Sequence, residues 1–333
     1  MVYSGEKSMN STMLKIRSVA LNHKKLLLFV IKIFIAVIIL YLLINKISIE
    51  QILQAFQLAR IKFIVLSFLL LFFNLFLQYK KWKLLVGLFK PDVRTYEILS
   101  SLLAGLTLGL VTPGRVGEFG RVLFIKNSKW TNLVGLVLID KLFALVVIYL
   151  FGLFGFFYFL QLKSNLLIWL PLKIVLLLLL FIFLFFILHP QLLKMVLIRF
   201  FPFLNRYKKI SQIFSSLDDF KSKHAYKLFS LAVLHVITYV MQFYLLICAF
   251  TSVHLFKGLL AIVSTMMAKT LLPVSFGDLG IRESAAVFFF SHFNVSQAAA
   301  FNASFLLFLI NVFIPGLTGL VLILVNRFYD NNK

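Results

Sequence analysis

The sequence predicts an all-α polytopic membrane protein with six full transmembrane helices and two re-entrant helical hairpins, arranged as an inverted repeat. The first observation is composition: 62% of the 333 residues are hydrophobic and only 14% are charged, whereas an ordinary soluble domain has about 25% charged residues. The second is that apolar residues form runs of about 20, the length with which a helix crosses a hydrocarbon core about 30 Å thick. The third is a short motif that occurs twice, each time after a shorter apolar stretch.

The first 25 residues carry five Lys or Arg residues and are predicted to be a cytoplasmic basic segment. The apolar run that follows, residues 26–44, is too long for the core of a signal peptide and has no small-residue cleavage site. We therefore expect it to remain in the membrane as an anchor. Five further full-length spans are expected at residues 61–79, 133–160, 166–188, 228–250 and 298–325.

Two shorter apolar stretches, residues 98–111 and 258–272, end at polar, glycine-containing segments before apolar residues resume. Neither arm reaches the roughly 20 residues that a crossing requires, so both are predicted to be arms of re-entrant hairpins. The expected organisation is a basic segment at 1–25, a membrane domain at 26–327 with repeat halves of about 26–160 and 166–327, and a cytoplasmic tail at 328–333.

The Lys and Arg residues favour one orientation of these segments, because cytoplasmic loops hold an excess of both. Of the 34 basic residues, 23 fall in segments predicted to be cytoplasmic, including residues 80–97 and 189–227, and only five fall in the predicted outer loops. Both termini are therefore predicted to be cytoplasmic. The formal charge of +23 is attributed to topology and to anionic lipid, so no nucleic acid is expected as a partner.

The two hairpin tips share a sequence pattern. Residues 112–121 read TPGRVGEFGR, and residues 272–283 read LPVSFGDLGIRE. Both fit Pro-x-x-x-Gly-acid-apolar-Gly, followed within two residues by Arg. Three full spans separate the tips, so the hairpins would enter the membrane from opposite sides, as in inverted repeats that hold a substrate near the midplane. The alternative is that both tips are tight turns between ordinary spans.

The residue types in the tips favour binding of an anionic group. Proline ends a helical arm, and the amides freed at the start of the next helix attract anions. Arginine offers planar donors that match phosphate, and the acids would neutralise the arginines when no substrate is bound. The predicted substrate-binding residues are Arg115, Gly117, Glu118, Arg121, Gly277, Asp278, Arg282 and Glu283. The same charges also fit purely structural ion pairs.

Polar residues inside or beside the predicted spans are candidates for lining the same cavity. Some recur at helical spacing on one helix face, and others are charges that are expensive to place in a membrane. The candidates are Asn74, Gln78, Asp140, Lys141, His235, Tyr239, Gln242 and Lys269. Hydrogen bonds between helices explain the amides and His235 equally well.

Sequence signals for cofactor chemistry are missing. The chain has no P-loop, zinc-protease, nucleophile-elbow or dinucleotide-binding motif. Its single cysteine, Cys248, provides neither an intramolecular disulfide nor a thiol metal cluster, and His235 has no other metal ligand at suitable spacing. We therefore expect no cofactor and no metal, and enzymatic activity is not favoured.

The two tips resemble the signature segments of the lysylphosphatidylglycerol synthase transmembrane family, the flippase-like domain. The matching segments are residues 112–121 and 276–286, and the resemblance covers about residues 25–327. Phe276 and Asp278 depart from the family's usual Gly-Gly-Leu-Gly-like turn. The resemblance implies a multi-pass protein of the bacterial or archaeal inner membrane, associated with translocation of lipids or lipid-linked sugars. Family members that transfer lysine carry an additional soluble aminoacyl-transferase domain, for which this sequence shows no counterpart.

Three functions remain open at this point. The first is translocation, without ATP, of an anionic phospholipid or a polyprenyl-phosphate-linked sugar whose head group binds between the two tips. The second is a role as accessory subunit of a lipid-modifying or glycolipid-synthesis enzyme. The expected protein partners are such an enzyme or further copies of this chain in a homo-oligomer. The third is an integral membrane transferase that uses the acids and His235 at the cytoplasmic face.

Overall fold

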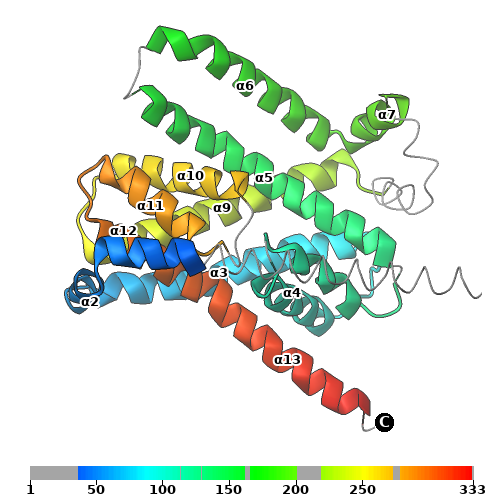
Figure 1. Ribbon diagram of the computed structural model, residues 1–333. Coiled ribbons are helices and arrows are strands. Elements are labelled where there is room, and N and C mark those ends of the chain that lie inside the picture. The colour runs from blue at the N-terminus through cyan, green and yellow to red at the C-terminus, as the bar shows by residue number, and fades with distance from the viewer. Residues whose placement is uncertain are drawn as a thin grey trace, which may run out of the picture.

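The computed structural model of this chain describes residues 37–112, 114–128, 130–161, 166–200, 219–272 and 278–331 (Figure 1). All regular elements in these ranges are helices, which confirms the predicted all-α class. Five of the described helical stretches are long and apolar enough to cross a membrane. They are α3 (Ile61–Val86), α5 (Trp130–Gln161), the Leu170–Leu188 part of α6 (Leu166–Leu188), α9 (Ser222–Phe250), and Gln297–Val325, which runs through α12 (Gln297–Phe308), η3 (Leu309–Phe313) and α13 (Ile314–Asn331).

A sixth span is obtained when a bent pair of helices is counted as one. Val37–Ile47 and α2 (Ile49–Gln57) meet at an angle of 74°. Ser48 lies between them with φ 71°, and its Oγ caps α2 by accepting a hydrogen bond from the backbone N–H of Gln51. The predicted first span thus lies partly outside the described residues. Its described part ends at a sharp bend, and α2 occupies what we expected to be an outer loop.

The predicted hairpin segments form two pairs of short helices. The first pair is α4 (Thr95–Leu110) with the 3₁₀-helix η1 (Val116–Phe124), and the second is α10 (Leu255–Leu271) with α11 (Ile281–Ser291). The two members of each pair pack against each other. Helices α4 and α10, at 16 and 17 residues, are shorter than an ordinary crossing.

Each hairpin packs against a span from the other half of the chain. Helix α4 lies against α13, α10 lies against α5, and α3 pairs with α9. Glycines permit the first two contacts, because a Cβ at Gly319 would overlap the Leu103 carbonyl, and one at Gly155 would lie 2.8 Å from the Leu260 carbonyl. Small residues of this kind let membrane helices approach closely.

Helix α3 is longer than predicted. The apolar run suggested an end at Tyr79, but the helix continues to Val86 because Trp82, Leu85 and Val86 are fully buried. Lys81, which we assigned to a cytoplasmic loop, is therefore a buried residue of the helix. In the predicted connection 189–227, α7 (Pro190–Phe200) is helical and residues 201–218 lie outside the described ranges.

The outer surface of the spans is apolar, as expected for contact with lipid. Phe72 on α3 and Leu178 and Phe181 on α6 are exposed. Figure 1 shows α6 beside α5 at the edge of the bundle, and most of the side chains of residues 170–188 are exposed. The polar residues gather instead in the interior, between the two hairpins.

Candidate functional site

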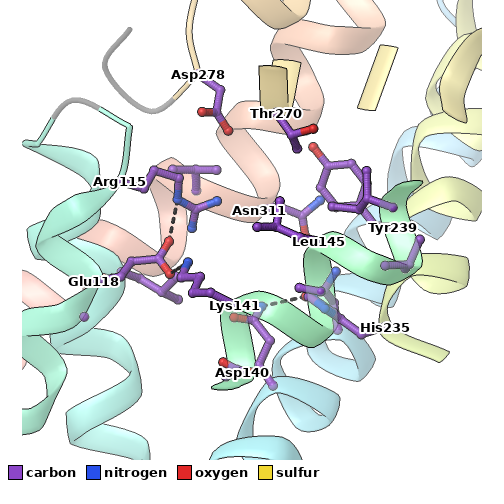
Figure 2. Close-up of a pocket in the computed structure, with 18 of the residues that line it drawn as sticks. Arg115, Glu118, Asp140, Lys141, Leu145, His235, Tyr239, Thr270, Asp278 and Asn311 are labelled. Carbon is purple, nitrogen blue, oxygen red and sulfur yellow. Dashed lines mark hydrogen bonds and ion pairs between the residues drawn. The ribbon is translucent and has the colours of Figure 1, made fainter. Parts of the chain in front are cut away.

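A cavity of about 390 Å³ is bounded by side chains from both hairpins and from the central spans (Figure 2). Its wall contains five cations and three carboxylates, a formal excess of two positive charges among the described lining residues. These groups are Lys81, Arg115, Arg121, Lys141, Lys269, Glu118, Asp140 and Asp278. Apolar side chains from α4 and α5 complete part of the wall, including Leu102, Leu106, Leu145 and Ile148.

The first hairpin tip places a carboxylate between two cations. Gly114 and Arg115 have φ of 61° and 56°, so the chain makes a left-handed turn before η1, a conformation that is uncommon for arginine. Arg115 Nε lies 2.5 Å from Glu118 Oε1, and Lys141 Nζ donates to Glu118 Oε2. Burial raises the pKa of Glu118, but the charges of Arg115 and Lys141 lower it more, to about 2. Glu118 is therefore ionised at neutral pH.

Arg121, at the other end of η1, is fixed from several sides. Its Nη2 donates to Asp140 at 3.0 Å, and Lys81 donates to the second oxygen of the same carboxylate, also at 3.0 Å. The guanidinium lies over the Trp82 ring, 3.9 Å from the ring centroid. Ser101 accepts from Trp82 Nε1 and donates to the Arg121 carbonyl. This network holds Arg121 on the cavity wall.

Glycines of α4 and η1 bring the two arms of the first hairpin together. A Cβ at Gly105 would lie 2.7 Å from Arg121 Cβ, and one at Gly109 would lie 2.7 Å from Glu118 Cγ. Gly117 packs on the Leu108 carbonyl, where any side chain would overlap it. Gly117, predicted to bind substrate, therefore lies in the contact between the arms and not on the cavity lining.

The second tip contributes a carboxylate with its own partner. Asp278 has φ 65° and accepts from Lys269 Nζ at 3.2 Å. Burial raises the pKa of Asp278, but the nearby charges of Lys269 and Arg115 lower it below its usual range. The Lys269 ammonium also lies 5.3 Å from the centre of the Tyr239 ring. Gly277, predicted for the same site, lies outside the described residues.

Arg282 and Glu283 do not line the cavity. They are 1% and 0% exposed, and Arg282 Nη2 lies 2.5 Å from Glu283 Oε1. Ser304 accepts from Arg282 Nε, and Glu283 accepts from the backbone N–H of Gly280 at the start of α11. Arg282 and Glu283, expected from the motif to bind substrate, instead form a buried pair with each other and with Ser304, between α11 and α12.

A chain of amides links α3 to α9 on the opposite wall. Asn74 donates to Gln242 and accepts from Gln78 at 2.7 Å. His235 Nε2 lies 3.1 Å from Asn74 Oδ1 and so carries the proton, which leaves Nδ1 as an acceptor. Gln242 is fully buried and is not part of the lining. The other predicted lining residues, Asn74, Gln78, Asp140, Lys141, His235, Tyr239 and Lys269, do lie on the cavity wall.

Comparison with known proteins places the chain in a family. Residues 29–319 match the family described as the lysylphosphatidylglycerol synthase TM region. The chain belongs to this family. The UPF0104 membrane protein PH1989 of Pyrococcus horikoshii is similar, at 24% identity over 331 residues, which cover 91% of this chain and 98% of the relative. No solved structure gives a significant match.

Membership of the lysylphosphatidylglycerol synthase transmembrane family confirms the resemblance seen in the two tips. It also agrees with a multi-pass membrane protein, because the matched region includes all five candidate spans apart from the last turns of α13. The first tip, residues 112–121, supplies Arg115, Glu118 and Arg121 to the cavity, and the second tip supplies Asp278.

Three polar residues of the cavity wall, Lys81, Thr270 and Asn311, were missed in the sequence. Lys81 follows Asn74 and Gln78 at the same helical spacing, so extending that face by one turn identifies it. Asn311 lies in η3, a short π-helix, and is the only polar residue in that turn. The only sequence signal for Asn311 was that it is a single amide inside an apolar run, which marks it as a candidate for a polar contact within the membrane domain.

Proposed function

We propose that this protein translocates an anionic lipid, whose head group occupies the cavity between the two hairpins. The observation that carries the proposal is the formal excess of two positive charges on the wall of the cavity between the hairpins. Charge placed at membrane depth without compensation is expensive, so a site of this composition favours an anionic ligand.

Three cations are placed to receive a phosphate. Arg115 and Lys141 share the single carboxylate of Glu118, and Arg121 shares Asp140 with Lys81. The Nε–H of Arg121 has no hydrogen-bond partner among the described groups. A phosphate that enters the wall beside Arg121 can accept from this buried donor, while its other oxygens exchange with Glu118 for Arg115 and Lys141. Charge-assisted bonds of this kind are the stronger class of hydrogen bond.

The apolar lining suits the rest of the lipid. Leu102 and Leu106 on α4 and Leu145 and Ile148 on α5 lie beside the charged groups. A head group bound at the cations can therefore keep its glycerol backbone and the first carbons of its acyl chains against an apolar surface. A soluble anion would leave this surface without a partner.

We attribute movement of the head group across the membrane to rocking of the two halves of the chain, which are related as an inverted repeat. The shared tip motif supports this arrangement, and so does the packing of α4 on α13 and of α10 on α5. A pair of glycines three residues apart occurs at each contact: Gly152 and Gly155 face α10, and Gly316 and Gly319 face α4. Close contacts of similar design in both halves suit rocking of one half against the other around a central site.

The same proposal includes the setting of the protein. The excess of basic residues in alternate loops supports cytoplasmic termini, and membership of the family supports a bacterial or archaeal inner membrane. The substrate is then a phospholipid or a lipid-linked sugar with at least one negative charge.

The test is lipid movement catalysed by the purified chain in liposomes. A fluorescent anionic phospholipid and a fluorescent zwitterionic phospholipid are compared. A quencher added outside the liposomes removes the fluorescence of lipid in the outer leaflet, so the quenched fraction reports how much lipid has changed leaflet. The parent protein should accelerate movement of the anionic lipid, and Lys141→Gln should slow it. Lys62→Gln, a change of the same kind outside the cavity lining, should leave it unchanged. Movement no faster than in protein-free liposomes contradicts the proposal.

A further inference from the structure

We propose that Asn311 binds a hydroxyl of the lipid head group, so that the cavity selects phosphate head groups that carry hydroxyls. This inference rests on the proposed function and specifies its substrate class. It starts from a local irregularity of the last span: residues 309–313 form a single π-helical turn between α12 and α13. Such turns are rare, and they occur most often at functional sites.

Asn311 is the unsatisfied amide of the site. The residue is only 7% exposed and lines the cavity, yet neither Oδ1 nor Nδ2 has a hydrogen-bond partner among the described groups. Asn74 and Gln78, the other described amides on the wall, are both hydrogen-bonded. A buried polar group without a partner is unfavourable, and most buried polar groups in proteins have one, so the two free polar atoms of Asn311 call for a partner.

Uncharged polar groups of the cavity wall lie opposite the ion pairs of the first hairpin. Figure 2 shows Arg115, Glu118 and Lys141 together on one side, with Asn311 and Tyr239 facing them from the other. The side that contains Asn311 also contains His235, whose Nδ1 has no partner among the described groups. Arg115 and Lys141 therefore suit an anion, and Asn311 and His235 opposite them offer uncharged partners. Lys269, beside Tyr239, is itself paired with Asp278.

A hydroxyl is the uncharged group that fits these atoms. An amide offers one acceptor oxygen and two donors, and a hydroxyl both donates and accepts. His235 Nδ1 adds a second acceptor, because Nε2 is occupied by Asn74. With the phosphate at the cations, a polyol attached to that phosphate would place hydroxyls toward Asn311. The two sources of this chemistry are a glycerol and a sugar ring.

The experiment compares lipids of equal charge that differ in their hydroxyls. Phosphatidylglycerol and phosphatidylpropanol both carry one phosphodiester charge, but the second has no hydroxyl on its head group. Binding is measured by native mass spectrometry, and transport is measured in liposomes. The parent should prefer phosphatidylglycerol by about three- to tenfold, as expected for a neutral hydrogen bond. Phosphatidylinositol is the third lipid. If the parent binds it more tightly than phosphatidylglycerol, the site is assigned to a ring polyol. If the parent binds phosphatidylglycerol more tightly, the site is assigned to glycerol.

The variant Asn311→Leu keeps the approximate size of the side chain and removes its polar atoms, so the preference should disappear while binding of phosphatidylpropanol is retained. Asn311→Ser keeps one hydroxyl and should retain part of the preference. Gln297→Leu is the control: it removes an amide of the same span that lies outside the cavity lining, so the full preference for phosphatidylglycerol should remain.

Equal binding of the two lipids by the parent, or an unchanged preference in Asn311→Leu, overturns the inference. The preference without transport of either lipid supports the role of Asn311 and contradicts translocation. Transport of both lipids at equal rates, with equal binding, supports translocation and contradicts the role of Asn311.

Discussion

The guanidinium of Arg121 stacks on the indole ring of Trp82 at 3.9 Å from the ring centroid, and this contact orients the arginine on the cavity wall. Nη2 of the same group lies 3.0 Å from Asp140 Oδ2. A planar guanidinium can lie over an aromatic ring and still donate hydrogen bonds, whereas the ammonium of lysine is a point charge without a plane.

Arg121→Lys should therefore weaken binding of an anionic lipid although the charge is kept. Loss of one charge-assisted hydrogen bond corresponds to about a ten- to hundredfold lower affinity. Lipid affinity is measured with the folded protein in detergent. Arg282→Lys is the contrasting change, because Arg282 is bonded to Glu283 and does not line the cavity. Unchanged affinity in Arg121→Lys would mean that Arg121 has only a structural role.

Asp140 is predicted to be essential for stability. Asp140 is only 8% exposed, and its carboxylate pairs with both Lys81 and Arg121. Asp140→Asn leaves two buried cations without a counter-charge, and removing one member of a buried ion pair costs about 3–5 kcal/mol. Thermal unfolding in detergent should show a clear fall in melting temperature. Adding Lys81→Met to Asp140→Asn should restore part of the loss, and no recovery would argue against direct pairing.

Glu118 is predicted to compete with the substrate. Because Glu118 accepts from Lys141 and lies 2.5 Å from Arg115, Glu118→Gln should free both cations. Binding of an anionic lipid should become tighter by about tenfold, as for one charge-assisted bond, and its release should become slower. Equilibrium binding and transport are measured together, and faster transport with weaker binding would contradict this role.

The pH dependence provides the control for Glu118. Its pKa is about 2 in the folded protein, against an ordinary value of 4.5. A lowered pKa means that its ion pairs stabilise the fold above pH 4.5, and that this contribution is lost as the pH falls toward 2. Between pH 5 and 8, the ratio of affinities of the parent and Glu118→Gln should therefore stay constant.

The fold class and the charged part of the site could be predicted from the sequence, because hydrophobic run lengths and repeated charged motifs are local signals. Arg115 and Glu118 were identified through the motif. Arg282 and Glu283 belong to the same pattern, but their mutual pairing and the contact with Ser304 depend on the packing of α11 on α12. A motif cannot distinguish a residue that faces a cavity from one that faces a neighbouring helix.

Other features depend on packing alone. The extension of α3 to Val86 follows from burial of Trp82 and Leu85 between helices, although the sequence there is rich in lysine. The π-turn that presents Asn311 gives no periodic signal, because it is one turn inside a continuous apolar run. Such elements are decided by contacts between distant segments, which a single sequence does not contain.

The glycine contacts between the halves are predicted to be equivalent in function. A Cβ at Gly155 would lie 2.8 Å from the Leu260 carbonyl, and a Cβ at Gly319 would overlap the Leu103 carbonyl. Gly155→Ala and Gly319→Ala should each overpack a hairpin contact, at about 1–3 kcal/mol, and slow lipid transport. Transport is measured in liposomes, with Gly87→Ala at the end of α3 as the control. An effect in only one half would contradict a shared mechanism.

The last prediction concerns which sides of the membrane the two hairpins reach. Three spans separate the hairpins, and the basic residues favour a cytoplasmic position for the loop after η1. In a Cys248→Ala background, Lys126→Cys should react with an impermeant thiol reagent only from the cytoplasmic side, and Lys257→Cys only from the outside. Both positions are exposed, so access to reagent depends on the side of the membrane. A membrane-permeant reagent should label both cysteines and serves as the control. Labelling of both from one side would exclude the inverted arrangement.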